Sequence, residues 1–164
     1  MAIVRRGTYF VYTIQSGDTL YSIANRLGSN VSDITLINVL YPPFTDPGLI
    51  FSGQRIIVPY PYNPRSQVVY FVQPGDTLQS IGRSFVMPVN QLIEANPQIE
   101  SPELLQAFDM VEIPARVYVV ESGDSLASIS RKLDVSAQTI IAMNQGRTGF
   151  SPDVIYSGYG LLVP

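Results

Sequence analysis

The chain has 164 residues, of which 46% are apolar and 14% are charged, and its formal net charge is −3. Basic residues this few and scattered argue against nucleic-acid binding, which needs clustered lysine and arginine to neutralise phosphates. The sequence contains no cysteine and no histidine, so it can form no disulfide and no Ser-His or Cys-His catalytic pair. The common protein ligands of zinc, copper and haem are also missing, and we therefore expect no metal and no cofactor.

The first predicted element is a short strand around Tyr12, where apolar and β-branched residues alternate. A Gly-Asp turn follows, and the pair Asp18-Thr19 is typical of the residues that cap a helix N-terminus. The next apolar residues recur at the spacing of one helix face, which predicts a helix of about ten residues. They are Leu20, Ile23 and Leu27.

A second helix start lies at Asn30, and the pair Ile34 and Ile37 predicts a short amphipathic helix that ends near Asn38. A loop that contains proline and glycine then leads to a second strand over residues 54–58. The order of the unit is therefore βααβ. We expect its two strands to pair antiparallel, with both helices packed on one face of the sheet.

This unit occurs three times along the chain. Its Gly-Asp-Thr/Ser-Leu motif stands at residues 17–20, 75–78 and 123–126. Each copy continues with Ser-Ile in one register, and each closes on an aliphatic residue followed by proline. An asparagine follows each motif at a constant distance: Asn38, Asn96 and Asn144. We predict an α+β protein of three tandem modules: module 1 over residues 9–60, module 2 over 67–115 and module 3 over 116–164.

The two junctions between modules differ in length and composition. Residues 60–66 contain two prolines, which favour an extended, semi-rigid spacer, so we expect module 1 to behave as an independent domain. The second junction is only about Ala115-Arg116, which predicts that modules 2 and 3 touch and unfold together. A module of this size without a disulfide or metal has a marginal core, so a packed neighbour would stabilise it.

The combination of motifs resembles the LysM family over about residues 9–164. The shared features are the Gly-Asp-Thr/Ser-Leu turn, the following Ser-Ile, the asparagine, and an ending such as Gly53-Gln54 with Val58-Pro59. Two copies depart from the Gly-Gln of that ending. Phe108-Asp109 stands there in module 2, and Gly158-Tyr159 lacks the glutamine in module 3.

The resemblance implies a shallow groove that binds β-1,4-linked N-acetylglucosamine between two walls. The first wall is the loop after the first strand, made of Gly17, Asp18, Thr19 and Leu20, of Gly75, Asp76, Thr77 and Leu78, and of Gly123, Asp124, Ser125 and Leu126. The second wall is the loop after the second helix, made of Asn38, Val39 and Leu40, of Asn96, Pro97, Gln98 and Ile99, and of Asn144, Gln145 and Gly146. Tyr41 and Phe44, in the proline-rich loop of module 1, are the aromatics best placed to lie against a sugar.

Elementary chemistry is compatible with such a site. Backbone amides of a glycine turn can approach an N-acetyl group closely, and an apolar side chain such as Ile99 can cover its methyl group. Each class of residue also has a structural interpretation: the aspartates suit helix caps, the glycines suit the turn, and the asparagines can tie down the end of the second helix. Tyr41 and Phe44 can equally be packing residues.

The expected function is non-catalytic binding of peptidoglycan or chitin, which would anchor or target the protein to a bacterial cell wall or spore. The alternative is a structural or interaction protein of a spore coat or envelope. An enzyme is the third interpretation, but a glycosidase needs two carboxylates across the scissile bond, and the close pair Glu100 and Glu103 lies in one loop of one copy. We expect no nucleic acid, no membrane span and no signal peptide, with a separate hydrolase or spore-coat protein as a further partner.

Overall fold

The computed structural model describes residues 4–5, 7–43, 49–60, 63 and 65–164. Module 1 consists of β2 (Thr8–Thr13), α1 (Leu20–Leu27), α2 (Val31–Ile37) and β3 (Arg55–Tyr60). Module 2 consists of β4 (Gln67–Phe71), α3 (Leu78–Ser84), α4 (Val89–Ala95) and β5 (Met110–Ile113). Module 3 consists of β6 (Arg116–Val119), α5 (Leu126–Leu133), α6 (Ala137–Met143) and β7 (Gly160–Val163). The predicted α+β architecture of three βααβ modules is confirmed, and a short strand β1 (Val4–Arg5) precedes them.

The first helix of each module begins at a capping box. Thr19, Thr77 and Ser125 are the N-caps of α1, α3 and α5, and each hydroxyl accepts a hydrogen bond from the backbone N–H of a serine three residues further on. That serine hydroxyl also accepts a hydrogen bond from the backbone N–H of the cap residue, so two backbone donors that a helix start leaves unpaired are both satisfied. The repeated Thr/Ser-x-x-Ser spacing therefore fixes where each first helix starts.

The strands of each module pair antiparallel, as predicted, but the modules also share sheets. Strand β2 pairs in parallel with β4, from Thr8 opposite Gln67 to Val11 opposite Tyr70, which joins modules 1 and 2 in one four-stranded sheet of order β3-β2-β4-β5. Strand β1 pairs with β6, so the N-terminal residues complete the sheet of module 3. The expectation that module 1 is an independent domain is wrong, because its first strand is a central strand of a shared sheet.

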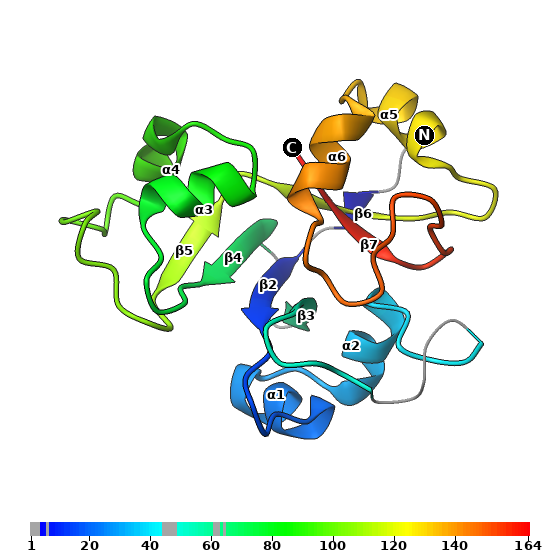
Figure 1. Ribbon diagram of the computed structural model, residues 1–164, viewed down its shortest axis with the longest axis horizontal. Helices are drawn as coiled ribbons and strands as arrows, with labels where there is room; N and C mark the ends of the chain where they lie inside the picture. Colours follow the sequence, from blue (N-terminus) through cyan, green and yellow to red (C-terminus); the bar gives the residue numbers. More distant parts are fainter. Residues whose placement is uncertain (1–3, 6, 44–48, 61–62, 64) are drawn as a thin grey trace.

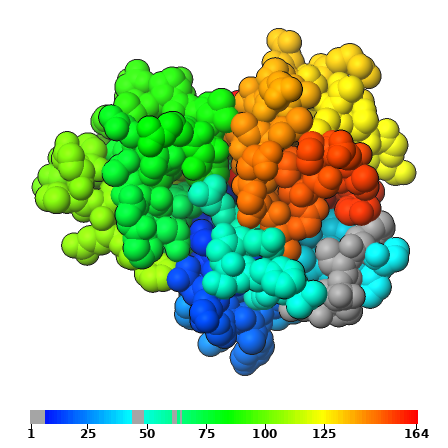
Figure 2. All heavy atoms as spheres, in the orientation of Figure 1, coloured from blue at the N-terminus to red at the C-terminus, as the bar shows by residue number. Residues whose placement is uncertain are grey.

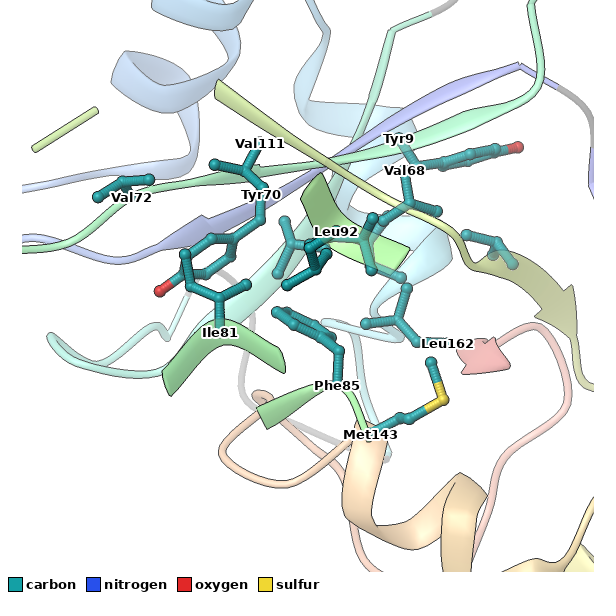
Figure 3. Close-up of a cluster of buried hydrophobic side chains, with 14 of the residues drawn as sticks. Tyr9, Val68, Tyr70, Val72, Ile81, Phe85, Leu92, Val111, Met143 and Leu162 are labelled. Carbon is teal, nitrogen blue, oxygen red and sulfur yellow. The ribbon is translucent and has the colours of Figure 1, made fainter. Parts of the chain in front are cut away.

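The largest buried cluster draws side chains from all three modules. Figure 3 shows Tyr9 of module 1 and the Tyr70 and Phe85 rings of module 2 in one cluster with Met143 and Leu162 of module 3. The expected contact between modules 2 and 3 is therefore confirmed. In Figures 1 and 2 the modules form three lobes that meet at this centre. Small domains bury too little surface to be stable alone, so this shared core supplies what a module of about 50 residues lacks.

Among the described residues, no helix is long and apolar enough to cross a membrane.

Candidate functional site

The aspartate of each Gly-Asp turn is held by the tyrosine six residues before it. In module 1, Tyr12 Oη donates to Asp18 Oδ2 at 2.6 Å, and the backbone N–H of Gln15 donates to the same oxygen at 2.8 Å. The tyrosine–aspartate bond recurs at the same length in modules 2 and 3, between Tyr70 and Asp76 and between Tyr118 and Asp124. The prediction that these aspartates cap the helix is therefore wrong in detail, because the neighbouring threonine or serine is the cap and the aspartate braces the turn.

Two of these carboxylates also have a basic side chain beside them. Asp18 Oδ1 lies 2.7 Å from Arg26 Nη2, and Asp124 Oδ1 lies 2.6 Å from Lys132 Nζ. Burial by itself raises the pKa of Asp124, but the hydrogen bonds from Lys132, Tyr118 and the backbone outweigh it and lower that pKa to about 2. In module 2, burial and the bond to Asp76 raise the pKa of Tyr70 to about 12. A carboxylate whose pKa is lowered in this way, as that of Asp124 is, is poorly suited to donate a proton to a substrate.

The glycine of each turn presents backbone to solvent. Gly17, Gly75 and Gly123 have φ angles of 85°, 87° and 86°, a conformation that L side chains rarely adopt. A Cβ built on any of them would meet nothing within 4 Å, so all three turns are open above the backbone. The N-cap residues Thr19, Thr77 and Ser125 are exposed, whereas Leu20 and Leu78 are buried and Leu126 is half-buried under the turn.

The repeated asparagine joins the second helix to the second strand. In module 2, Asn96 Nδ2 donates to the carbonyls of Leu92 and Glu112, each at 2.8 Å, and its Oδ1 accepts from the backbone N–H of Glu112 at 2.7 Å. Asn38 and Asn144 make the corresponding three bonds in modules 1 and 3. All three side chains are at most 1% exposed, so they position the second wall rather than present an amide at its surface.

The remaining second-wall residues differ between modules. Val39 and Leu40 are buried, each 1% exposed, and Tyr41 is half-buried. Pro97 and Gln98 are exposed and Ile99 is half-buried. Gln145 and Gly146 are exposed. Phe44 lies outside the described residues.

Two hollows lie near these walls. One, of about 540 Å³, is formed by the loop between α4 and β5 of module 2, with Gln98, Ile99, Leu104 and Met110 in its lining. The other, of about 450 Å³, lies between modules 1 and 3, with Tyr9, Tyr41 and Tyr60 in its lining. Tyr41 therefore faces module 3 rather than the Gly-Asp turn of its own module.

Two features of the site have no counterpart in the sequence-based expectation. One is the tyrosine brace, although its signal was present as a tyrosine six residues before each aspartate. The other is Arg147, a buried arginine whose guanidinium carbon lies 4.5 Å from the centroid of the Tyr159 ring. Its guanidinium donates a hydrogen bond to Asn144 Oδ1 at 2.9 Å and another to Asn38 Oδ1 at 3.2 Å. Nothing in the sequence around Arg147 indicates that it connects two modules.

Three βααβ modules, each with a braced Gly-Asp turn and an asparagine-anchored loop, define a tandem array of one small repeat. The model of the LysM domain matches three segments of the chain, residues 12–59, 70–114 and 118–164. The chain belongs to the LysM domain family.

Its relatives include a protein named as a LysM effector and proteins named as enzymes. The chain is 26% identical to the secreted LysM effector ECP6 of Passalora fulva, over 93% of this chain and 76% of the effector. It is 37% identical to the putative sporulation-specific glycosylase YdhD of Bacillus subtilis, over 65% of this chain but only 22% of the glycosylase. Among solved structures, the spore cortex-lytic enzyme SleL of Bacillus cereus is 30% identical over 65% of this chain and 22% of the enzyme, with a TM-score of 0.44.

Proposed function

We propose that the chain binds polymers of N-acetylglucosamine, such as peptidoglycan or chitin, without cleaving them. The observation that carries this proposal is the repeated pairing of an open Gly-Asp turn with an asparagine-anchored loop in a member of the LysM family. The turn offers backbone amides to an acetamido group, and the loop offers apolar surface to its methyl group. The low charge of the chain suits a neutral ligand.

The acidic residues near the walls support a non-catalytic role. Asp18, Asp76 and Asp124 each accept a tyrosine hydroxyl and a backbone N–H, so they hold the turn in place. Glu100 and Glu103 are both exposed on one loop of module 2, whereas a glycosidase places its two carboxylates on opposite sides of the bond that it cleaves. The chain matches only 22% of the glycosylase YdhD.

Anchoring at a bacterial cell wall or spore is the role that fits this binding. The similarity to a sporulation-specific glycosylase favours the spore, and a separate hydrolase or a coat protein would be the natural partner of a chain that contributes binding alone. The alternative, a structural protein of a spore coat or envelope, predicts assembly with proteins and no affinity for soluble glycans.

Calorimetric titration separates these two functions. The full chain is titrated with N-acetylglucosamine oligomers of increasing length, with matched peptidoglycan fragments, and with chitosan oligomers that lack the acetyl groups. Affinity is expected to rise with oligomer length, to need the acetyl groups, and to change little with salt, because no phosphate charge is neutralised. Equal affinity for the chitosan oligomers, or no binding to any acetylated oligomer, contradicts the proposal.

A further inference from the structure

The second wall of module 1 is covered by module 3. Val39 is 1% exposed and belongs to one apolar cluster with Tyr118 and Leu161 of module 3. Tyr41 packs against the same cluster. The loop that follows α2 therefore serves as a contact between modules.

The second wall of module 3 is bonded to module 1 in return. The backbone N–H of Arg55 donates to the carbonyl of Gly146 at 2.9 Å, and the N–H of Thr148 donates to the carbonyl of Arg55 at 2.9 Å. Between these two bonds, the buried Arg147 donates to Asn38 Oδ1 across the interface. Each of the two modules thus uses its second wall to hold the other.

The second wall of module 2 faces away from both neighbours. In Figure 1 the loop between α4 and β5 forms the outer edge of the green lobe, on the side opposite to modules 1 and 3. Pro97 and Gln98 are exposed, and Ile99 is half-buried against the shared core. The hollow of about 540 Å³ opens here, with Leu104 and Met110 in its lining.

The exposed side chains of this loop suit the apolar parts of an acetylated sugar. Leu104, Phe108 and Met110 are 74%, 50% and 58% exposed, a larger and more exposed group than Leu49 and Phe51, which are 46% and 53% exposed in the corresponding loop of module 1. Phe108 also has a φ of 68°, whereas Gly53 and Gly158 occupy the equivalent positions of modules 1 and 3. A phenylalanine in a conformation that favours glycine is a strained choice, and such strain concentrates at binding sites.

We infer that module 2 holds the one accessible glycan groove among the grooves that the described residues form, so that each chain binds a single glycan strand and modules 1 and 3 act together as its scaffold. This inference rests on the proposed function, and it identifies which of the three repeats performs it. The contacts that would hold the acetamido groups come from the exposed Gly75 turn on one side and from the loop of Gln98 and Leu104 on the other.

Calorimetry with a chitin tetrasaccharide tests this inference in the full chain. Three matched variants place one charge on an exposed apolar residue in the loop before the second strand of each module: Leu49→Asp, Leu104→Asp and Val154→Asp. These side chains are 46%, 74% and 49% exposed, so none of the substitutions should unfold the chain, and urea denaturation of each variant verifies this.

The expected result is a stoichiometry of one, with affinity lowered at least about tenfold by Leu104→Asp and unchanged by Leu49→Asp and Val154→Asp. A stoichiometry of two or three overturns the inference and leaves the proposed function intact. Loss of affinity in Leu49→Asp or Val154→Asp, with normal affinity in Leu104→Asp, also overturns the inference. Absence of any binding by the unmodified chain refutes the proposed function itself.

Discussion

Replacing Asn96 with alanine should destabilise the chain by about 3 kcal/mol. The substitution removes three hydrogen bonds of 2.7–2.8 Å and leaves two carbonyls and one N–H of the backbone without these partners. Each bond contributes about 1 kcal/mol, and a buried group without a partner adds to the loss. In a chain of this size, 1 kcal/mol corresponds to roughly 2–4 °C in the melting temperature, so a fall of roughly 6–12 °C is expected.

The exposed Asn90 on the same helix provides the matched control, because Asn90→Ala makes the same chemical change where the side chain faces solvent. Urea denaturation followed by circular dichroism gives the free energy of unfolding of both variants. Equal stabilities would refute the structural role assigned to Asn96. If Asn96→Ala also bound glycans less well while it remained as stable as the control, the asparagine would be a ligand contact after all.

Three further predictions follow from the described contacts. The folded pKa of Asp124 is lowered to about 2, so this carboxylate stabilises the fold by at most about 2 kcal/mol. That stabilisation is present above the unfolded pKa near 3.8 and is lost as the pH falls towards 2. Asp124→Asn should remove this part of the acid sensitivity in urea titrations between pH 5 and 2. Phe108→Gly should leave the free energy of unfolding unchanged or raise it by up to about 1 kcal/mol. The substitution relieves backbone strain of about 1–2 kcal/mol, but glycine gives the unfolded chain more conformational entropy, which offsets part of the gain. A loss of more than about 1 kcal/mol would mean that the phenyl ring packs against the fold. Heating the full chain should give one calorimetric transition. An isolated module 1 of residues 9–60 should melt at a lower temperature than the full chain, because its β2 lacks the pairing with β4. An equal melting temperature of the two proteins would contradict the stabilising role of the shared sheet.

The local structure could be predicted from the sequence because its determinants lie close together in the chain. The spacing of Leu20, Ile23 and Leu27 follows from the helix period, and the Thr-x-x-Ser pattern fixes the helix start. The sequence pattern could not predict that Thr19, and not Asp18, caps the helix, because both residue types are good N-caps. The structure decides between them through Tyr12, whose hydroxyl bonds to the aspartate.

The arrangement of the modules could not be predicted, because it depends on contacts between residues far apart in the sequence. The two prolines in residues 60–66 favour a spacer, but Tyr60 at the end of β3 and Gln67 at the start of β4 both pair with Thr8, so β4 lies parallel to β2 in the same sheet. In the sequence, Val39 is an apolar residue that follows a predicted helix, and nothing beside it indicates a partner. The fold places it in one buried cluster with Tyr118. The sequence places the same two walls in each module and leaves open which modules bind, whereas the fold places the second walls of modules 1 and 3 in contact with each other's module.

The pairing of β1 with β6 has a consequence for the order in which the protein folds as it is synthesised. Val4 leaves the ribosome long before its partner Tyr118, which follows only after modules 1 and 2 are complete. Without β1, one edge of β6 would have no strand to cover it, and an uncovered edge readily pairs with another chain. We expect N-terminal trimming that removes Val4 and Arg5 to increase aggregation during expression, even though both residues lie outside every module.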